Sequence, residues 1–531
     1  MSLEQPDDKV QVTYVYLHPG NDDQEHFCGK TKVVDFVPKK ASELPIWDSG
    51  VPTSSEVEIL LRPVRLYNDP FRRGNNKLVL CDTLSDDMTP LPSNHRQPCL
   101  EAMEAAKDEH PWFGLEQEYM LMDVNDNWPL GWPKGGYPED IHLPHVLYHS
   151  AVGANKQFGR DVMDAHFRAC LYAGVNISGE NAEAMPSQWE YQVTYVFSHP
   201  AKDGLEHLCN KSRVIDFVPK QASDLPVWDC GLVTDTVTEM VLRPVRLYND
   251  PFRGGNNKLV LCDTLTPDMT PMGSNHRQSC REAMEAAKGE HPWFSLEQEY
   301  LLLDASDNWP LGWPKGGYPE SISSPNVHYL YGVGANIQCG RDVMEAHFRA
   351  CLYAGVNISG ENAEAITGQW EYQVGPCEGI RIGDDVLMSR YLLHRVAEDL
   401  RIAVTFDPKP IPNMPGSGAH MNFSTEKMRA KGGLTEIERA IEKLSKRHEK
   451  HLALYDPHEG ADNARRLIGS QFYGSDMNTF TSGVGNRGAS IRIPKRVAQE
   501  GRGYMEDRRP AANCDPYMVA EALVRTCLLN E

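Results

Sequence analysis

The stretch Gln188-Trp-Glu-Tyr-Gln-Val-Thr-Tyr-Val196 decides how this chain is organised, because one internal repeat ends and another begins within it. Its first six residues return as Gln369-Trp-Glu-Tyr-Gln-Val374. Its last five residues already occurred as Gln11-Val-Thr-Tyr-Val15. Both matches are displaced by 181 residues, and blocks such as Asp69-Pro-Phe-Arg72 and Asp250-Pro-Phe-Arg253 keep that offset without insertion or deletion.

The two copies therefore span about residues 11–191 and 192–372, while the tail, 373–531, occurs once. Solenoid repeats are about 20–45 residues long, so this pattern predicts a tandem duplication of a large piece instead. One copy plus the tail makes 350 residues, the size of a complete enzyme. The alternative is an error of the gene model, or two alternative exons read together.

The composition is that of a soluble globular protein. The chain has 531 residues, of which 24% are charged and 40% hydrophobic. It contains no apolar run of about 18 residues, so we expect no membrane span. The polar, acidic N-terminus lacks the features of a secretory signal. The 13 cysteines form no Cys-x-x-Cys motif, which favours reduced thiols and a cytoplasmic location.

The net charge of −21 disfavours nucleic acid as a partner, because such a surface repels phosphate. The charge is unevenly distributed along the chain. Residues 373–531 hold 23 Lys and Arg against 21 Asp and Glu, so the excess of acid lies in the two copies. If an anionic ligand binds, we expect the tail to supply its positive partners.

Each copy begins with short β-branched or apolar runs separated by Pro and Gly, which predict strands. In the second copy these runs are 193–197, 214–218, 239–243 and 258–262. The segment 341–354 has apolar residues at helical spacing, and Gly355 predicts its end. In the tail, Thr435-Glu-Ile-Glu438 predicts a capping box at the start of a helix that carries Ile437, Ile441, Leu444 and Leu452. Alternating strands and helices predict an α/β barrel or a curved sheet.

Carboxylates are the first candidates for chemistry. Leu296-Glu-Gln-Glu-Tyr-Leu-Leu-Leu303 predicts a strand, on which Glu297 and Glu299 share one face. Two carboxylates on one face repel unless a cation lies between them, and oxygen ligands suit Mg²⁺ or Mn²⁺. The alternative is a solvated strand face. Glu364 and Glu371, on either side of Ala-Ile-Thr-Gly-Gln-Trp, add two more carboxylates.

A histidine and several arginines complete the candidate set. His420 and Asn422 share a strand face within Gly416-Ser-Gly-Ala-His-Met-Asn-Phe-Ser424, although a lone histidine is more often structural. The arginines of the tail include Arg466, Arg487, Arg492 and Arg508, and arginine binds carboxylate and phosphate in a bidentate manner. A surface ion pair is the alternative for each one. Together these residues predict a metal–phosphate–carboxylate site, and no Gly-x-x-x-x-Gly-Lys-Ser/Thr motif is present.

From about residue 192 to 531, and again through the first copy, the chain resembles the eukaryotic-type glutamine synthetases. The blocks that carry this resemblance include Asp250-Pro-Phe-Arg253, Lys258-Leu-Val-Leu-Cys262, His291-Pro-Trp-Phe294, Glu297-Gln-Glu-Tyr300, Phe406-Asp-Pro-Lys-Pro-Ile-Pro412, Ser490-Ile-Arg-Ile-Pro494 and Glu506-Asp-Arg-Arg-Pro510.

The resemblance implies an α+β fold, with a β-grasp N-terminal domain and a catalytic α/β domain built on a curved sheet. Applied to both copies, it predicts a β-grasp-like domain at 11–97, a truncated catalytic half at 98–191, a second β-grasp domain at 192–278 and an ATP-binding catalytic domain at 279–531. It also implies a homo-oligomeric ring, in which each active site lies between one catalytic domain and a neighbour's β-grasp domain.

The activity implied is the ligation of ammonia to glutamate, in which ATP first converts the carboxylate to an acyl phosphate. By resemblance, Glu299, Glu364 and Glu371 hold one divalent metal, and Glu297, His420 and Glu506 the second. Glutamate would contact Gly416, His420, Arg466 and Arg508. ATP and its phosphates would contact Gln373, Asn422, Ser424, Arg487 and Arg492. The catalytic arginines would be Arg466, Arg487 and Arg508.

The chain departs from the family pattern where ammonia is expected. The family has a flap with a glutamate after its Asn-Ala-Arg-Arg-Leu motif, but here Ile468-Gly-Ser-Gln-Phe-Tyr-Gly-Ser475 contains no acid, and Tyr473 is the best match to that glutamate. The segment that matches the family's ammonium-binding loop reads Trp228-Asp-Cys-Gly231. Whether Asp229 replaces the aspartate that binds ammonium in the family is left open. Pro415 stands where the family has an asparagine before the Gly-rich turn. Loss of a general base typically lowers the rate of a reaction by 10²–10⁴-fold. A γ-glutamyl ligase for another amine and a non-catalytic assembly protein therefore stay open as alternatives.

The first copy predicts half a site. It has four matching carboxylates but no tail of its own to supply histidine and arginine; they are Glu116, Glu118, Glu183 and Glu190. Its strands also lack the sheet partners that the tail encodes, which would leave apolar edges exposed. We therefore expect this copy to be non-catalytic, and either poorly stable or completed by another subunit.

Overall fold

The computed structural model describes most of the chain, in segments separated by gaps. The described residues are 9–19, 25–52, 58–124, 127–132, 152, 158–182, 188–192, 194–200, 206–213, 215, 217–230, 240–315, 331, 333, 338–469 and 475–531. The chain divides into two compact units, Met1–Gln117 with Arg160–Ser178, and Glu118–Gly159 with Gly179–Glu531. Among the described residues, no helix is both long and apolar enough to cross a membrane.

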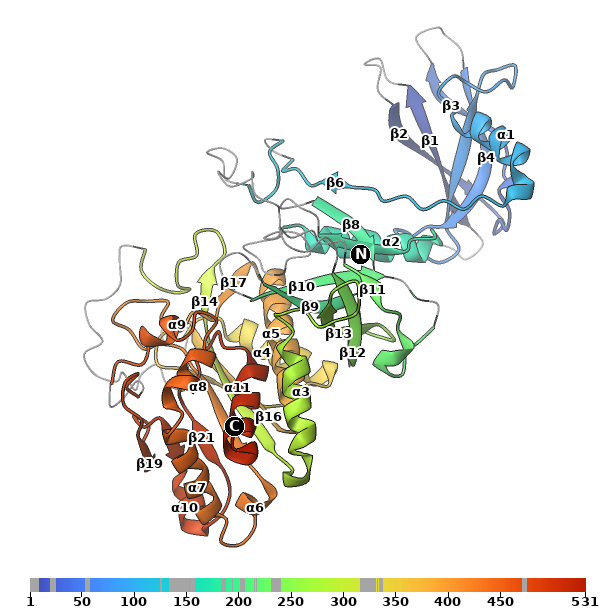
Figure 1. Ribbon diagram of the computed structural model, residues 1–531. Coiled ribbons are helices and arrows are strands. Elements are labelled where there is room, and N and C mark those ends of the chain that lie inside the picture. The colour runs from blue at the N-terminus through green and yellow to red at the C-terminus, as the bar shows by residue number, and fades with distance from the viewer. Residues whose placement is uncertain are drawn as a thin grey trace. The chain divides into compact units, whose positions relative to one another are not determined.

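The first unit is built on a five-stranded sheet of order β2-β1-β5-β4-β3 (Figure 1). The strands are β1 Val10–Pro19, β2 Glu25–Val34, β3 Trp47–Pro52, β4 Glu58–Asn68 and β5 Lys77–Leu84. The central strand β1 runs antiparallel to β2 and parallel to β5. Val10, Val12, Tyr14 and Tyr16 alternate along β1 on the buried face, so this sheet has a core of its own.

Outside this sheet, burial in the first unit is uneven. The two α-helices of this unit are α1 Arg96–Ala105, which has no buried residue, and α2 Arg160–Ala173, which has four. Between them, residues 110–118 form neither helix nor strand. The side chains of Trp112, Phe113 and Leu115 in this stretch are exposed, although they are apolar.

The second unit begins with an eight-stranded sheet of order β11-β12-β13-β9-β10-β7-β8-β6. Its strands are β6 Tyr119–Met120, β7 Gly179–Ala182, β8 Gln188–Gln192, β9 Tyr195–Pro200, β10 Glu206–Arg213, β11 Trp228–Asp229, β12 Val241–Asn249 and β13 Lys258–Leu265. The first three strands come from the first copy and the other five from the second. The two sets join where β7 pairs antiparallel with β10.

The other sheet of this unit has the order β15-β16-β14-β18-β21-β20-β19, and β17 pairs with the far end of β14. The strands are β14 Trp293–Asp304, β15 Ile358–Ala363, β16 Gln369–Glu378, β17 Ile402–Thr405, β18 Ala419–Ser424, β19 Ser482–Val484, β20 Ile491–Ile493 and β21 Met505–Asp507. The strands β17 to β21 belong to the tail. The central strand β14 is therefore held by β16 of its own copy on one side and by β18 of the tail on the other.

Helices cover this sheet (Figure 1). The α-helices are α3 His276–Ala286, α4 Arg341–Ala354, α5 Arg381–Asp399, α6 Glu426–Arg429, α7 Leu434–Ser445, α8 His448–Leu454, α9 Ala461–Ala464, α10 Lys495–Glu500 and α11 Pro516–Val524. Short 3₁₀ turns are η1 Ala41–Glu43, η2 Lys107–Glu109, η3 Ala222–Asp224 and η4 Lys288–Glu290, and η5 Arg525–Leu529 is π-helical. The helix α5 is buried along most of its length, as expected for a helix at the centre of the core.

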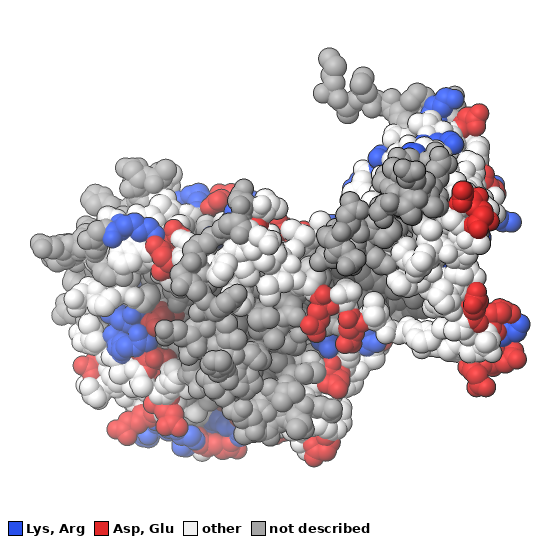
Figure 2. Space-filling view, turned by 90° about the horizontal axis from the view of Figure 1, so that it is seen from above, with Lys and Arg blue, Asp and Glu red and all other residues white. Residues whose placement is uncertain are grey.

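Buried polar contacts tie α5 to the elements around it. Asp384 of α5 accepts hydrogen bonds from Arg277 of α3 at 2.8 Å and from the hydroxyl of Tyr517 of α11 at 2.7 Å. The next residue, Asp385, accepts from the hydroxyl of Tyr248 of β12 at 2.9 Å. On the face seen in Figure 2, basic and acidic side chains are interspersed rather than gathered into separate fields.

Several predicted elements are confirmed. The helix α4 spans the predicted residues 341–354 and ends at Gly355, whose φ of +91° suits glycine. The strands β13 and β14 occupy the predicted stretches. Near the other two predicted strands, β9 begins at Tyr195 and β12 at Val241.

Two local predictions are wrong. The predicted strand at 214–218 is absent among its described residues, since β10 ends at Arg213 and Phe217 and Val218 are not in a strand. Pro219 follows directly and cannot donate to a ladder. The predicted capping box is also absent. The helix α7 begins at Leu434 with Gly433 as its N-cap, because carbonyl groups of the preceding turn already accept from its first amides. Leu452 lies on the separate helix α8.

Candidate active site

The candidate site is organised by the pairing of β14 with its two neighbours. Glu297 and Glu299 lie two residues apart on β14 and share a face. On one side Glu297 lies opposite His420 of β18, and on the other Glu299 lies opposite Glu371 of β16. Directly opposite residues of antiparallel strands have Cα atoms about 4.5–5.5 Å apart, so the register brings these side chains together.

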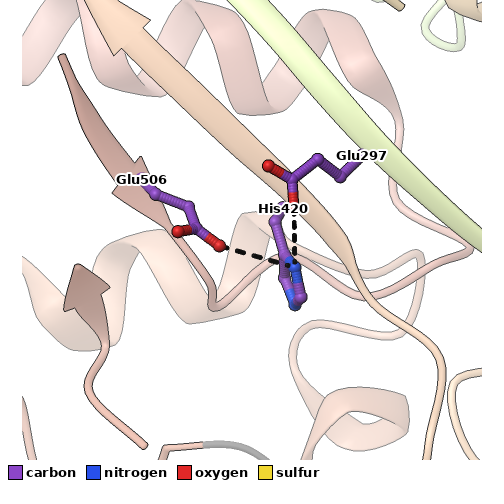
Figure 3. Close-up of side chains that lie close together, drawn as sticks. All are labelled: Glu297, His420 and Glu506. Atoms are coloured by element: carbon purple, nitrogen blue, oxygen red, sulfur yellow. Dashed lines mark ion pairs between the residues drawn. The ribbon is translucent and has the colours of Figure 1, made fainter. Parts of the chain in front are cut away.

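The first group consists of Glu297, His420 and Glu506, from β14, β18 and β21 (Figure 3). The Nδ1 atom of His420 lies 3.5 Å from Oε2 of Glu297 and 3.7 Å from Oε1 of Glu506. All three side chains offer a ligand atom, and these atoms lie within 4.8 Å of one another. The structure thus assembles the three residues that the resemblance assigns to one metal.

The second group consists of Glu299, Glu364 and Glu371, whose carboxylate oxygens also lie within 4.8 Å of one another. Glu364 follows β15, and its backbone N–H donates to the carbonyl of Gln369 at 2.9 Å, which closes the turn before β16. The Nε2 atom of His420 lies 4.0 Å from Oε1 of Glu299. The two groups are therefore adjacent, with the His420 imidazole between Glu297 and Glu299.

The electrostatics of the two groups fit divalent cations. Burial, followed by the charge of Glu364, raises the pKa of Glu299 to about 8. Burial and the neighbouring carboxylates Glu364, Glu297 and Glu299 raise the pKa of Glu371 well above its usual range. Burial, followed by the charge of Arg508, lowers the pKa of His420 and so favours the neutral imidazole that binds metals. Crowded carboxylate oxygens and an imidazole nitrogen suit Mg²⁺ or Mn²⁺.

Arginines flank the first group. Glu506 is buried, and its carboxylate lies 2.5 Å from Nη1 of Arg508 and 2.6 Å from Nε of Arg492. Arg508 also donates from Nε to the backbone carbonyl of Arg487 at 3.0 Å. The side chain of Arg487 is exposed, that of Arg492 is half-buried and that of Arg508 is buried. These three residues thus form one basic border beside the carboxylates.

Arg466 is buried and held by backbone carbonyls. Its Nη2 donates to the carbonyl oxygens of Arg508, Arg509 and Pro510 at 3.1, 2.8 and 2.9 Å. Burial lowers its pKa to about 10, so the guanidinium stays charged at neutral pH. A Cβ at Gly416 would lie only 2.7 Å from Cγ of Arg466, so the turn requires glycine for this close approach.

Two of the residues expected near ATP lie beside the carboxylates. The side-chain amide of Asn422 donates to Oε1 of Glu297 at 2.9 Å. That of Gln373 donates to Glu371, and also to Oδ1 of Asn362 at 3.0 Å. Ser424 is buried and donates to the carbonyl of Gly503 at 2.6 Å. Their role toward ATP stays a prediction.

Comparisons with known proteins place this geometry in a family. Residues 275–529 match the family model described as "Glutamine synthetase, catalytic domain". The chain is 57% identical over 332 residues to the glutamine synthetase of Panulirus argus, covering 61% of this chain and 90% of the relative. It is 51% identical over 347 residues to "Glutamine synthetase 2 cytoplasmic" of Drosophila melanogaster, covering 64% and 91%. For the Homo sapiens glutamine synthetase the identity is 49% over 354 residues, covering 66% and 92%.

The chain belongs to the glutamine synthetase family. The aligned lengths of 332 to 354 residues agree with one copy plus the tail, which is 350 residues long. Each alignment therefore leaves out a part of this chain that is about as long as one copy. The mixed sheet of β14 to β21 with its helices is the glutamine synthetase catalytic domain, and it carries both carboxylate groups.

Sequence reasoning missed two contributors to this glutamine synthetase site. The side-chain amide of Asn362 donates to Oε1 of Glu364 at 3.2 Å, and its Oδ1 accepts from Gln373, so it orients Glu364 of the second group and the glutamine that donates to Glu371. The backbone N–H of Gly418 donates to Oε2 of Glu299 at 2.8 Å. Asn362 lies in β15 two residues before Glu364, and this short spacing is the signal that could have identified it.

The expected ammonia residues are not all described. Tyr473 and Gly231 lie outside the described residues, as does Glu183 of the first copy. Asp229 is described and lies exposed at the end of β11. In the first copy, Glu116 and Glu118 are exposed in the stretch without regular structure, and Glu190 lies in β8. Among the described residues, metal-like groups occur only in the catalytic domain.

Proposed function

We propose that this chain is an ATP-dependent ligase that joins ammonia to L-glutamate and forms L-glutamine through γ-glutamyl phosphate. The observation that carries the proposal is the pair of adjacent groups on the β14 face, bordered by Arg492 and Arg508. Family membership supports the same reaction, because the relatives are named glutamine synthetases.

Each group would hold one Mg²⁺ or Mn²⁺ ion. Glu299, Glu364 and Glu371 would bind one of these ions, and Glu297, His420 and Glu506 the other. Bound divalent ions would neutralise phosphate oxygens and make the terminal phosphorus of ATP easier to attack. The hydrogen bonds from Asn422 to Glu297 and from Asn362 to Glu364 would orient the ligand carboxylates.

The arginines would position the anionic substrates. Arg466 and Arg508, with Gly416 and His420, would bind glutamate, while Arg487 and Arg492 would contact the phosphates that are transferred. Gln373, Asn422 and Ser424 would line the ATP site. The glutamate γ-carboxylate attacks the terminal phosphorus, ADP leaves, and ammonia then displaces phosphate from the acyl carbon. Arg466, Arg487 and Arg508 would stabilise the charge that develops in these steps.

We further propose the organisation that the family resemblance implies. The segments 11–97 and 192–278 would be β-grasp domains, 98–191 a truncated catalytic half, and 279–531 the ATP-binding domain. The matching strand order of the five-stranded sheet and of β10, β9, β13, β12 and β11 supports the equivalence of the first and third segments. The enzyme would be cytoplasmic, and it would act as a homo-oligomeric ring.

A second candidate function has a specific sequence observation behind it. The stretch 468–475 contains no acidic residue, so a base for ammonium is lacking where the family has one. Loss of the flap glutamate would also leave room for an amine larger than ammonia, so a γ-glutamyl ligase for such an amine is the second candidate. If neither ammonia nor another amine is used, the chain would act as a non-catalytic assembly protein that binds nucleotide.

The deciding experiment measures ADP release by the purified full-length chain with glutamate, ATP and Mg²⁺, with and without ammonium. Ammonium-dependent release is the expected result, and Tyr473→Glu should increase its rate. Release that requires methylamine or a longer amine would favour the second candidate. ATP binding without ADP release for every amine would overturn both ligase functions.

A further inference from the structure

A ligand-sized cavity lies in the second unit, separate from the two carboxylate groups. Its walls come from β9 and β10, from the helices α3, α5, α8 and α11, and from the turns that follow β17 and α8. Its volume of about 720 Å³ is typical of cavities that hold small organic molecules, which are about 300–1,000 Å³. In the described lining, no residue of either carboxylate group takes part.

The wall of this cavity is acidic. Five carboxylates line it in the described part of the chain, against one arginine and three histidines. The carboxylates belong to Asp407, Asp456, Glu459, Asp462 and Asp515. The guanidinium of Arg390 is buried and already donates to Oε1 of Gln298 and to two backbone carbonyls of the segment before α11. The cavity therefore suits a cation better than an anion, because its one permanent positive charge is already surrounded by acceptors.

Asp515 has a carboxylate oxygen that is left for a ligand. Its Oδ1 caps α11 by accepting from the backbone N–H groups of Tyr517 and Met518 at 2.7 and 3.2 Å. Its Oδ2 accepts no hydrogen bond from the described residues, and the nearby imidazole of His276 forms no ion pair with it there. Burial raises the pKa of Asp515, because a carboxylate withdrawn from water loses the solvation of its charge. A cation beside Oδ2 would restore that stabilisation.

The other acidic side chains are engaged or face solvent. Asp407 and Asp462 both pair with Arg465, at 3.1 and 3.0 Å. Asp456 accepts from three backbone N–H groups between residues 458 and 463 at 2.8 to 3.0 Å. Glu459 is exposed. These carboxylates add negative charge to the wall, whereas Asp515 offers a direct contact.

Three enclosed polar atoms of the lining also have no hydrogen-bond partner among the described residues. They are Oγ of Ser198, Oγ of Ser274 and Oδ1 of Asn513. All three accept hydrogen bonds, and a serine hydroxyl is redirected by rotation about a single bond. Buried polar atoms in folded proteins are normally paired, so these three favour a ligand that donates hydrogen bonds.

We propose that this cavity binds an aliphatic amine in its protonated form. The ammonium group would donate to Oδ2 of Asp515, and the hydrocarbon part would lie against the side chains of Leu387, Leu454 and Met518. An ammonium group has three N–H donors and a positive charge, which match the excess of acceptors and the acidic wall. This site differs from the one where an amine would be ligated, since a substrate must reach the carboxylate groups on the β14 face.

Two hydrogen-bonded paths join the cavity to the proposed active site. In the first, Asp456 accepts from the backbone N–H of Asn463 at 2.8 Å, and Oδ1 of Asn463 accepts from Nε of Arg466 at 3.1 Å. In the second, Arg390 holds Gln298, which lies on β14 between two metal-binding candidates. An amine in the cavity is therefore expected to change the affinity for glutamate, and glutamate to change the affinity for the amine by the same factor. This link rests on the proposed role of Arg466, whereas the amine site does not.

The test is isothermal titration calorimetry of the purified full-length chain with hexylamine, at neutral pH and without ATP or glutamate. We expect saturable binding of one molecule per chain. Hexan-1-ol and hexanoate carry a neutral and a negative head on the same hydrocarbon, and they should not saturate the site. Asp515→Asn should weaken hexylamine binding by about tenfold or more, because the hydrogen bond loses its charge. Asparagine caps a helix as well as aspartate, so α11 should stay folded.

Glu442→Gln is the matched control. It removes one negative charge from the exposed side of α7, where Glu442 pairs with Lys446, and should leave hexylamine binding unchanged. Equal binding of hexylamine and hexan-1-ol, equal weakening in both variants, or no binding to the folded parent chain would overturn the proposal. So would binding that Glu299→Gln abolishes and Asp515→Asn spares, because the amine would then lie at the carboxylate groups. These titrations need no turnover, so an inactive enzyme leaves them valid.

A second titration, with glutamate and Mg²⁺ present, tests the link between the two sites. Glutamate binding is first measured alone in the same calorimeter. A shift of about fivefold or more in the Kd for hexylamine supports the link, and an unchanged Kd would show that the two paths carry no coupling. A chain that binds hexylamine but no glutamate would contradict the proposed function and not the amine site.

Discussion

The two copies contain nearly the same sequence at His110-Pro-Trp-Phe-Gly-Leu-Glu-Gln-Glu-Tyr119 and at 291–300, yet these two stretches differ in secondary structure and in burial. In the second copy this stretch enters strand β14, where Phe294 and Leu296 are 1% and 0% exposed. In the first copy their counterparts Phe113 and Leu115 are 78% and 87% exposed, in a stretch without regular structure up to Tyr119.

The cause is a missing partner rather than a missing propensity. The strand β14 pairs with β18, and β18 pairs with β21, but both partners belong to the tail that occurs once. The preceding sheets do not differ in this way. Tyr14 packs edge-on against Trp47 at 5.3 Å between ring centroids, and Tyr195 against Trp228 at 5.0 Å. The first part of each copy thus brings its own core, whereas the second part depends on the tail.

The largest expected effect concerns the carboxylates. Glu299→Gln should reduce ammonium-dependent ADP release by about a hundredfold or more, because a metal ligand supplies several kcal/mol of charge stabilisation. The matched variant Glu118→Gln changes the first-copy counterpart, which is exposed, and should leave the rate unchanged. Steady-state rates of the two variants check this. A loss in Glu118→Gln would mean that the first copy takes part in catalysis.

Stability should show the same contrast. Phe294→Ala should lower the free energy of unfolding of the catalytic domain by about 3–5 kcal/mol, the usual cost of removing a buried phenyl ring. Phe113→Ala should change it by less than about 0.5 kcal/mol, because an exposed ring loses little contact. Urea unfolding followed by tryptophan fluorescence measures both. Similar losses in the two variants would show that the first copy has a packed core at this stretch.

The dependence of stability on pH should differ between the helices α4 and α2. Burial lowers the pKa of His347 on α4 to about 4, against about 6.5 in an unfolded chain. Below pH 6.5 the unfolded state binds a proton that the folded state does not. The free energy of unfolding therefore decreases as the pH is lowered, and it levels off below about pH 4. Between pH 7 and pH 5 the loss from this group is about 2 kcal/mol.

His347→Gln should remove that part of the pH dependence, measured by urea unfolding at the two pH values. His166→Gln is the control, because His166 is the counterpart of His347 and lies exposed on α2. The His166→Gln substitution should remove a much smaller part of the pH dependence of unfolding. An unchanged pH slope in His347→Gln would mean that another group is responsible for the loss of stability in acid.

The smallest effect is a difference in thiol reactivity that needs no mutation. Cys99 of α1 is exposed, whereas its counterpart Cys280 of α3 is buried, and burial raises the pKa of Cys280 well above its usual value. Iodoacetamide should therefore modify Cys99 in the native chain and leave Cys280 unmodified until unfolding. Peptide mass spectrometry distinguishes the two sites. Equal labelling would show that α3 opens as readily as α1.

The local pattern and the family resemblance predicted different parts of the site. Alternation alone placed Glu297 and Glu299 on one face of a strand, and the structure confirms this. It could not pair Glu297 with His420, because the register between β14 and β18 joins residues 123 positions apart. Only the resemblance to glutamine synthetases divided the six metal-binding candidates into the two groups that the structure assembles.

What sequence could not predict depends on contacts between distant segments. The pattern of 214–218 indicated a strand, but Pro219 and the end of β10 at Arg213 decided otherwise. Nor did it indicate that β7 would pair with β10, because the edges of the first-copy strands had no identified partner in the same chain. Pairing of this kind is set by which edges remain open after each core has formed.

The exposed Trp112, Phe113 and Leu115 also bear on the lifetime of the chain in a cell. Chaperones and proteases act on apolar segments that are normally hidden in folded proteins. This chain displays such a segment while its catalytic domain is intact. Its turnover by quality control is therefore expected to follow the accessibility of these three side chains rather than the unfolding of the catalytic domain, and any molecule that covers them would lengthen its half-life.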